Sequence, residues 1–488
     1  RVYDGAKWED ANVDDGVPSP PVVEGNKEEG EEERGIFNND GEIFVSVVSF
    51  RDGARCGRTL KNLFDNASDP TKITAGVVEQ NSGRDKKCLV EYCKLYGPPM
   101  SDYKTADLAI NSPLLRKNCP FYDRIKYVAV FDIAAKGPSY ARSLTRKLLG
   151  DQEFCMQVDA HSDFTSRWDD VSREQWHMVE NEFGILSNQP AKMEEKSDRE
   201  PGGTKYDELP RGCNVRIGEY TGIPSYDNPT DGLARGLDRP LLSRTWSAAF
   251  SFAKCHLEET APYDNFAPQL FDAEQFPRYA RFWTRGYDAY TPAVNIAYHD
   301  ADPNPDGIDP LNWASRGYPS PKVQREGALK RIHTLLGLEG GEKVQKARAN
   351  LGLYGLGRRR TLEQLEEFVG IDMIGKKSNT DDKRCGTLQY VPYDPSISPY
   401  ANMYDQPDDL DPQPEYPLRS VAHVNRDNDD IRFEGAGAGD SVLPMDAKRA
   451  REVLLRVPGD DRDDAASKSS PGTTLLVLWM FGLFVWRA

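Results

Sequence analysis

The sequence predicts an α/β protein in which a largely parallel central sheet carries helices on both of its faces. Strand-like and helix-like segments alternate along residues 42–161, which is the order that parallel strands joined by helices produce. The strand-like runs are apolar along most of their length, as expected for strands that are buried on both faces. These two observations together define the expected fold class.

Each element follows from its own residue pattern. The run EIFVSVVSF at 42–50 has the length and β-branched content of a buried strand. The helix expected at 56–67 places Leu60, Leu63 and Phe64 on one face. The other expected elements are strands at 73–81, 125–133 and 153–161, a helix at 138–150, and strand-like segments at 246–257 and 293–300. A stretch rich in glycine, proline and charge at 187–240 is expected to cross the surface.

A capping box predicts one further helix in the later part of the chain. In TLEQLEEFVG, Thr361 and Gln364 have the spacing at which each side chain can bond the other residue's backbone N–H. Leu362 and Leu365 give this helix an apolar face, and Gly370 is expected to end it.

Composition divides the chain into four parts. Residues 1–40 are expected to be a disordered acidic arm, because 1–34 hold eleven Asp and Glu against four Lys and Arg. Residues 41–376 carry the alternating pattern and are expected to fold as one domain. Residues 377–474 are expected to be an irregular tail rich in proline and aspartate, and 475–488 a short hydrophobic terminus.

The ends of the chain leave membrane association open. The apolar run LLVLWMFGLFVW in the hydrophobic terminus is twelve residues long, whereas a spanning helix needs about 20. Because the chain begins with Arg1 rather than Met, a signal or anchor could also have been lost from that end. We therefore expect that either end could associate with a membrane.

Charge and cysteine usage exclude some classes of function. The formal net charge of −16 argues against a surface that neutralises phosphates, so no nucleic-acid partner is expected. The eight cysteines show neither Cys-x-x-Cys spacing nor clustering with histidine, so we expect no zinc knuckle and no redox pair. Most are expected to be buried thiols, with disulfides as the alternative in an oxidising compartment.

Polar residues end the predicted strands at the edge where parallel sheets collect their ligands. Asp159 and His161 lie two positions apart at the end of the strand at 153–161, so both side chains are expected on the same face. An oxygen and an imidazole nitrogen together suit a borderline cation such as Mn²⁺. An isolated Asp-x-His is more often a strand-ending Asp beside a surface His, so this interpretation depends on its context.

Several motifs in a fixed order supply that context. They are VSVVSFRD (45–52), GVVEQ (76–80), GPSYAR (137–142), MQVDAHSDFTSRWD (156–169), the block from FSFA to NIAYHD (250–300) and LGLYGLGRRRTLEQLEEFVGID (351–372). In order and spacing they resemble glycosyltransferase family 60, the GT-A-fold N-acetylglucosaminyltransferases that modify hydroxyproline or Ser/Thr on polypeptides. The resemblance covers roughly residues 42–374. It implies that 41–376 are a GT-A catalytic domain with a Rossmann-like, mostly parallel sheet.

The resemblance also implies a metal site and a donor. Asp159 and His161 would hold Mn²⁺, or another divalent cation, with His299 as the third protein ligand. The cation would bridge the two phosphates of UDP-N-acetylglucosamine (UDP-GlcNAc). The alternative for His299 is a hydrogen-bonded structural histidine. Asp163, where the family usually has a basic or neutral residue, would either support the metal ligands or simply be exposed.

Further residues would bind the donor sugar nucleotide. The resemblance implies that Ser49, Arg51 and Gln80 line the uridine pocket, although each could be ordinary loop polarity. Arg142 would face the pyrophosphate or the sugar as a catalytic residue, unless it is a solvated helix charge.

The segment WTRGYD at 283–288 could close over the donor. In WTRGYD, Trp283 and Tyr287 would cover the donor and exclude water; the alternative is that both pack in the core.

The acceptor side departs from the family pattern. Where the family has Gly-Glu-Glu, this chain has DAEQ at 272–275, so Ala273 and Gln275 differ while Glu274 keeps its carboxylate. Glu274, expected to be catalytic, would orient the sugar or the acceptor hydroxyl. The loss of its neighbour leaves sugar specificity and activity open.

The resulting functional hypothesis is a metal-dependent retaining transferase that moves N-acetylglucosamine from UDP-GlcNAc to hydroxyproline or Ser/Thr of a protein. The implied acceptor is a ubiquitin-ligase adaptor in the cytoplasm, with a mucin-like polypeptide in the Golgi lumen or at its membrane as the alternative. A catalytically silent UDP-sugar-binding module of the same fold is the competing class of function. A metal-dependent hydrolase fits less well, because no dedicated base for water is evident.

Overall fold

The computed structural model of the chain describes residues 40–97, 113–197, 208–226, 233–270, 273–300, 321–338, 348, 351–378 and 388–402, together with short pieces at 2–3, 8–9, 19–20, 422–425 and 430–433. Most of the predicted arm, much of the predicted tail and the whole of 475–488 lie outside these residues. Among the described helices, none combines the length and the apolar character that crossing a bilayer requires. The division into four parts stays a prediction.

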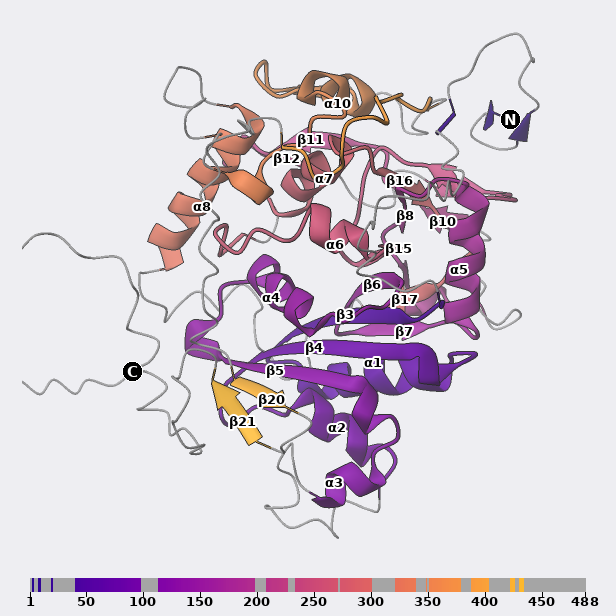
Figure 1. Ribbon diagram of the computed structural model, residues 1–488, viewed down its shortest axis with the longest axis vertical. Coiled ribbons are helices and arrows are strands. Elements are labelled where there is room, and N and C mark those ends of the chain that lie inside the picture. The colour runs from indigo at the N-terminus through magenta and orange to yellow at the C-terminus, as the bar shows by residue number, and fades with distance from the viewer. Residues whose placement is uncertain are drawn as a thin grey trace, which may run out of the picture.

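A ten-stranded sheet organises the molecule (Figure 1). Its strands lie in the order β14 (Leu241–Leu242), β16 (Asp288–Thr291), β8 (Gly184–Ser187), β15 (Phe250–Lys254), β6 (Phe154–Asp159), β3 (Ile43–Phe50), β4 (Ile73–Asn81), β5 (Ile125–Phe131), β20 (Ala422–Asn425) and β21 (Asp430–Phe433). The central strands β6, β3, β4 and β5 are parallel to one another. The predicted α/β fold class with a parallel centre is confirmed.

Antiparallel strands flank this parallel centre. β15 pairs antiparallel with both β6 and β8, and β20 pairs antiparallel with β5. The apolar pattern that predicts a buried strand does not contain its direction, so this feature was not expected. The expected strand at 246–257 is also shorter than predicted, because helix α6 begins at His256.

Smaller sheets complete the strand inventory. The three-stranded one has the order β7 (Ser162–Phe164), β17 (Ala297–His299) and β9 (Ala191–Lys192). The two-stranded ones pair β1 (Val2–Tyr3) with β2 (Trp8–Glu9), β10 (Glu208–Pro210) with β13 (Leu233–Arg235), β11 (Val215–Ile217) with β12 (Pro224–Tyr226), and β18 (Ile371–Asp372) with β19 (Lys377–Ser378).

Helices cover both faces of the parallel centre. The described helices are α1 (Gly53–Asp65), α2 (Cys88–Lys94), α3 (Pro113–Asn118), α4 (Pro138–Thr145), α5 (Trp168–Val179), α6 (His256–Thr260), α7 (Gln275–Trp283), α8 (Pro321–Leu336) and α10 (Leu362–Val369). Helix α1 lies on one face of β3 and β4, and α4 lies on the other (Figure 1). The Thr361–Gln364 capping box and the left-handed Gly370 that ends α10 are both confirmed.

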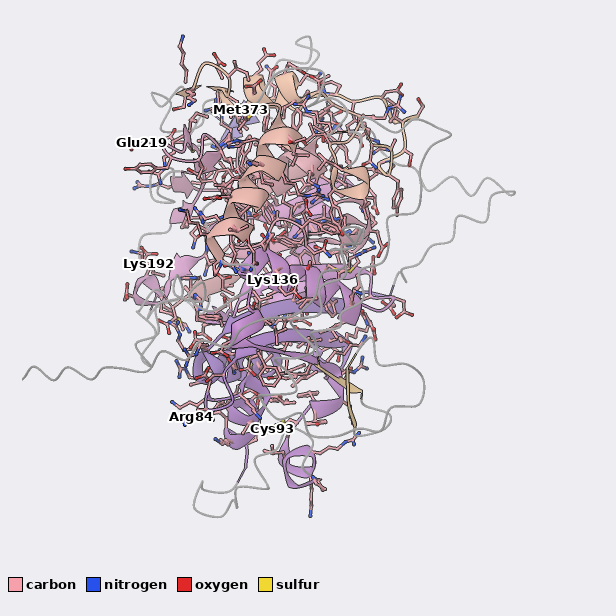
Figure 2. The ribbon with its side chains drawn as sticks, turned by 90° about the vertical axis from the view of Figure 1, so that its left-hand side faces the viewer. Arg84, Cys93, Lys136, Lys192, Glu219 and Met373 are labelled. Carbon is pink, nitrogen blue, oxygen red and sulfur yellow. A yellow bond between two sulfur atoms is a disulfide. The ribbon has the colours of Figure 1, made fainter. Side chains whose placement is uncertain are left out.

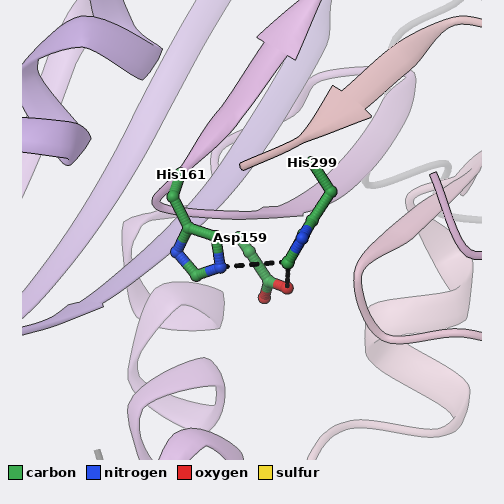
Figure 3. A group of neighbouring side chains, drawn as sticks. All are labelled: Asp159, His161 and His299. Carbon is green, nitrogen blue, oxygen red and sulfur yellow. Dashed lines mark hydrogen bonds and ion pairs between the residues drawn. The ribbon is translucent and has the colours of Figure 1, made fainter. Parts of the chain in front are cut away.

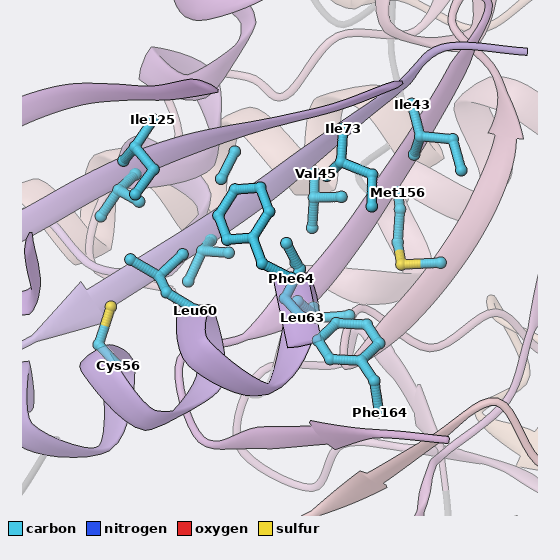
Figure 4. Packing of buried hydrophobic residues seen from close by; sticks show 14 of the residues in the cluster. Ile43, Val45, Cys56, Leu60, Leu63, Phe64, Ile73, Ile125, Met156 and Phe164 are labelled. Atoms are coloured by element: carbon cyan, nitrogen blue, oxygen red, sulfur yellow. The ribbon is translucent and has the colours of Figure 1, made fainter. Parts of the chain in front are cut away.

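Alternation along β3 explains how one strand serves two layers. Ile43, Val45 and Val47 pack against Leu60 and the other apolar residues of α1 (Figure 4). Phe44 belongs to a separate cluster on the α4 face. Since successive side chains of a strand point to opposite faces, a fully apolar strand must be covered on both sides.

A second large core lies beyond this sheet centre. It is built around α7, α8 and α10, and it includes Trp246, Phe282 and Leu365. Figure 2 shows the molecule from the side, with Arg84 and Cys93 towards one end, Met373 towards the other and Lys136 between them. Ala160 and Ala297, which lie close in sequence to the predicted metal ligands, belong to the first core.

The cysteines correct one expectation. Cys56 is bonded to Cys88, Cys93 to Cys119, and Cys155 to Cys255, and Cys213 is disulfide-bonded as well. Among the described residues no cysteine is a free thiol. The expectation that most cysteines are buried thiols is therefore wrong. The paired cysteines are 26–100 residues apart in the sequence, so no local pattern could indicate which of them are bonded.

One buried carboxyl group connects the sheet to α2. Glu79, on β4, is 1% exposed. It accepts a hydrogen bond from the Cys88 backbone N–H at 2.8 Å and another from the Tyr127 hydroxyl. Burial raises the pKa of Glu79 to about 8 from an ordinary value of 4.5. The folded protein therefore holds a proton on Glu79 at pH values where the unfolded chain has lost it.

We expect this proton to make stability pH-dependent. Between about pH 5 and pH 8 the folded state binds one more proton than the unfolded state, so raising the pH lowers the free energy of unfolding by up to about 1.4 kcal/mol per unit. In Glu79→Gln this contribution is absent, so thermal denaturation between pH 6 and pH 8 should show a smaller fall in Tm than in the wild type. The exposed Glu363→Gln in α10 is the control. Equal slopes for wild type and Glu79→Gln would contradict the assignment.

Candidate functional site

Strand pairing brings the three predicted metal ligands together. β6 ends at Asp159, and the chain turns through Ala160 and His161 into β7. β17 pairs antiparallel with β7, which places His299 opposite Ser162. His161 thus lies in the turn and not on the strand, so the expected reason for its convergence with Asp159 is wrong. The convergence itself is present.

The three side chains face one another at ligand distances (Figure 3). The Nε2 atoms of His161 and His299 are 3.0 Å apart, and His299 Nε2 is 3.3 Å from Asp159 Oδ2. Two atoms that each lie about 2.1 Å from one cation are about 3.0 Å apart at a right angle and about 3.4 Å apart at a tetrahedral angle. This is the one group of potential metal ligands that the described residues form, and it fits a divalent cation.

The electrostatics also favour metal-binding protonation states. Burial alone would raise the pKa of Asp159, but the hydrogen bond with His299 and the charge of Arg142 hold it below the ordinary value. Burial lowers the pKa of His161, which outweighs the opposite effect of Asp159. A charged carboxylate and a neutral imidazole are the forms that bind cations.

Arg142 fixes the orientation of Asp159. Its Nη2 lies 3.1 Å from Asp159 Oδ1, so Oδ2 is the oxygen that faces His299. The other end of the guanidinium, Nη1, donates to Glu274 Oε1. Arg142 is 4% exposed, so the interpretation as a solvated helix charge is wrong.

Glu274 has both carboxylate oxygens engaged. Arg142 donates to one of them and the Ser139 hydroxyl to the other. Burial raises the pKa of Glu274, and Arg142 offsets part of this rise. In this arrangement Glu274 positions Arg142. Sequence reasoning did not assign a role to Ser139, although it lies within the GPSYAR motif.

The residues next to Glu274 have structural contacts of their own. Gln275 Oε1 accepts the backbone N–H of Ala248 at 3.0 Å, and Ala273 is 3% exposed. Asp163 forms an ion pair with Lys196 at 2.7 Å. This contact differs from both expectations for Asp163, support of the metal ligands and simple exposure.

The three predicted uridine-binding residues lie at neighbouring strand ends but not on one face. Arg51 follows β3 directly, and its backbone N–H donates to the carbonyl of Gln80. Side-chain alternation puts Ser49 on the α1 face and Gln80 on the α4 face. Arg51 has φ +52° and forms a two-point ion pair with Asp85. The buried Ser49 hydroxyl has no hydrogen-bond partner within the described part of the chain.

Trp283 and Tyr287 do not lie on a surface segment. Both are 0% exposed and belong to the core around α7. The Tyr287 hydroxyl is hydrogen-bonded to Thr260 and His256, each at 2.7 Å. Of the two interpretations, core packing is the one that agrees with this structure, whereas a lid would need exposed side chains.

A cavity of about 410 Å³ adjoins His161 on its α1 side. It is lined by residues of α1, by the turn into β7 and by Asp300. Thr59 of α1 holds this turn, because its hydroxyl accepts the Ser162 N–H and donates to the Ala160 carbonyl, both at 3.0 Å. The sequence pattern predicted that Thr59 lies on a helix, but it did not predict this contact with the turn.

The chain matches the model of a known protein family. A family model described as "Glycosyltransferase (GlcNAc)" matches residues 42–375, which is more than half of the chain. No curated protein sequence matches.

Solved structures share low similarity with the chain. One is GalNAc-T7 with UDP, GalNAc and Mn²⁺, at 13% identity and a TM-score of 0.39; the match covers 68% of this chain and 55% of that one. Another is Staphylococcus aureus TarS 1–349 with UDP-GlcNAc, at 10% identity and 0.34, covering 70% and 78%. A third is the Pyrobaculum calidifontis mannosyltransferase PcManGT with GDP-Man and Mn²⁺, at 11% identity and 0.30, covering 63% and 79%.

We expect His299 to be required for cation binding, because it supplies the one ligand of the cluster from outside residues 159–161. His299→Ala should weaken Mn²⁺ binding by at least about tenfold, measured by calorimetry or by the electron paramagnetic resonance signal of free Mn²⁺. The matched control is His333→Ala on α8, whose ring bonds the Thr221 carbonyl outside the cluster. Unchanged Mn²⁺ affinity in His299→Ala would overturn the ligand assignment.

Proposed function

The chain belongs to the GlcNAc glycosyltransferase family, and from this premise we propose that it is a divalent-cation-dependent transferase. It moves N-acetylglucosamine from UDP-GlcNAc to a hydroxyl group of a protein, with retention of the anomeric configuration. The observation that supports this proposal best is the Asp159–His161–His299 cluster beside a buried arginine. Such a cluster suits a reaction in which a diphosphate must leave.

The chain's own residues have separable roles in this proposal. Asp159, His161 and His299 would hold the cation, and when bound it would supply positive charge to stabilise a departing diphosphate. Arg142 keeps Asp159 Oδ2 directed at the cation site. Its positive charge would also help to stabilise the negative charge of the departing diphosphate. Glu274 and Ser139 in turn keep Arg142 in place.

Retention is proposed to proceed without a glycosyl-enzyme intermediate. Besides Asp159, Arg142 contacts the carboxylate of Glu274, and both oxygens of Glu274 are already bound. An engaged, 8% exposed carboxylate is a poor nucleophile. The acceptor oxygen would therefore bond to the anomeric carbon on the face that the phosphate leaves, and the phosphate would take the proton.

The disulfides favour an oxidising compartment. Three described pairs join Cys56 to Cys88, Cys93 to Cys119 and Cys155 to Cys255. Such bonds persist in secretory compartments and are rare in the cytosol. We therefore propose the Golgi lumen or another secretory lumen in place of the cytoplasmic location that the sequence led us to expect.

This location selects between the two acceptors. A ubiquitin-ligase adaptor would be met in the cytosol, whereas mucin-like polypeptides are met in the secretory lumen. Serine or threonine of a mucin-like polypeptide is accordingly the proposed acceptor, and hydroxyproline is the alternative that the assay must compare.

Transfer to peptides tests the function. With UDP-GlcNAc and Mn²⁺, a peptide rich in Ser and Thr should gain N-acetylglucosamine, detected by mass spectrometry, and chelation of the cation should abolish the gain. A hydroxyproline peptide should react at least tenfold more slowly, and a peptide with Ala at every Ser and Thr should not react. Mn²⁺-dependent UDP binding without transfer to any peptide would instead favour the UDP-sugar-binding module.

Disulfide mapping tests the compartment. Protein isolated from its native cells with a thiol-blocking reagent present from lysis onward should yield the Cys56–Cys88, Cys93–Cys119 and Cys155–Cys255 peptides on non-reducing digestion. Reduction should lower Tm, because removing a native disulfide typically costs about 2–5 kcal/mol. Recovery of these cysteines as blocked thiols would refute the oxidising compartment.

A further inference from the structure

A buried carboxylate faces the side of His161 that points away from the other two ligands. His161 Nε2 is 3.0 Å from His299, whereas its Nδ1 is 3.8 Å from Asp52 Oδ2. A neutral imidazole carries one N–H and one lone pair, and a cation takes the lone pair. The ring can therefore bind through Nε2 only when its proton is on Nδ1.

Asp52 is fixed in the position from which it faces His161. Nε and Nη2 of Arg55 each lie 2.7 Å from Asp52 Oδ2, and both side chains are 8% exposed. Asp52 is the residue immediately before α1, and its carbonyl accepts the Cys56 N–H. A Cβ on Gly53 would lie 2.1 Å from the Lys86 carbonyl oxygen, so the start of α1 packs tightly against the segment before α2.

The same helix also holds the backbone on both sides of His161. Thr59, two turns into α1, bonds the carbonyl of Ala160 and the N–H of Ser162. Helix α1 therefore sets the position of the His161 backbone through Thr59, while Asp52, immediately before the helix, presents its carboxylate to the ring. Because backbone and ring are held by one rigid element, the geometry of the pair does not depend on a mobile loop.

We propose that Asp52 is a positioning residue that keeps the proton of His161 on Nδ1 and so directs the Nε2 lone pair at the divalent cation. The inference rests on the proposed metal-dependent function. At 3.8 Å the two atoms are beyond direct hydrogen-bond distance, and the interaction is electrostatic. The carboxylate charge attracts an N–H and repels a lone pair on the nitrogen that faces it, while the charge of Arg55, which is bound to the same oxygen, opposes this effect. Carboxylates that accept the second ring N–H of a metal-binding histidine set its tautomer and ring orientation, and Asp52 lies on the corresponding side of His161.

Metal affinity of the full chain tests the role. Asp52→Asn keeps the shape of the side chain and removes its charge, so it should weaken Mn²⁺ binding by about 10- to 100-fold. The measurement is titration with Mn²⁺ alone, followed by electron paramagnetic resonance. Asp163→Asn is the matched control, since that carboxylate lies two residues beyond His161 and is paired with Lys196. It should bind Mn²⁺ as the wild type does.

A second variant separates positioning from folding. Asp52→Asn leaves the buried Arg55 without its counter-charge, which can lower stability by itself. The double variant Asp52→Asn/Arg55→Met removes both charges; its Tm should recover while its Mn²⁺ affinity stays weak. Because loss of the Arg55 charge itself favours cation binding, the double variant is compared with Arg55→Met. Equal Mn²⁺ affinity in these two variants would show that Asp52 is only structural and would overturn the proposal.

The tautomer can be observed directly. The chain has six histidines, which can be labelled with ¹⁵N. In the metal-free wild type, long-range ¹H–¹⁵N spectra should show His161 protonated on Nδ1, and in Asp52→Asn they should show a mixture of the two tautomers. His161→Ala assigns the signal. Wild-type Mn²⁺ affinity in Asp52→Asn, with binding lost in Asp159→Asn, would overturn this inference alone. Wild-type affinity in Asp159→Asn would overturn the metal site and the proposed function with it.

Discussion

The candidate site depends on the pairing of two short strands. β7 and β17 are each three residues long, yet their antiparallel register places His299 beside His161, which is 138 residues earlier in the chain. The backbone N–H of Asp300 adds a hydrogen bond to the His161 carbonyl at 2.8 Å. Without this pairing, Asp159 and His161 would be two ligands at a strand end, which is too few to hold a cation firmly in water.

A network of buried charges lies beside the candidate site, on its α4 side. Arg142 joins Asp159 to Glu274, and Ser139 completes the contacts of Glu274. One guanidinium cannot neutralise two carboxylates, so these three side chains carry an excess negative charge that a bound divalent cation would offset. The arrangement also assigns one oxygen of Asp159 to the arginine and leaves the other for the cation site. Orientation of the ligand is thus built into the fold before any cation binds.

Local patterns predicted much of the fold and fewer of the site contacts. The strand at 73–81 and the capping box of α10 were predictable because apolar runs and capping signals are contained in a few consecutive residues. The direction of β15 and the cysteine pairs depend on residues far apart in the sequence, so no local pattern contains them. The metal cluster was predicted through motif resemblance. Trp283 and Tyr287 show the limit of that route, since a motif gives the residues but not their burial.

The covalent bond between Cys155 and Cys255 has a consequence for how the molecule opens. It ties β6, the strand that ends at Asp159, to the residue that follows β15, its antiparallel neighbour. Thermal fluctuations that separate neighbouring strands are therefore restrained in this part of the sheet. Amide hydrogens of β6 should exchange with solvent only through the largest unfolding events, while the outer strand β14 exchanges through smaller ones. The scaffold beneath the cation site is thereby kept among the last parts of the protein to lose its structure.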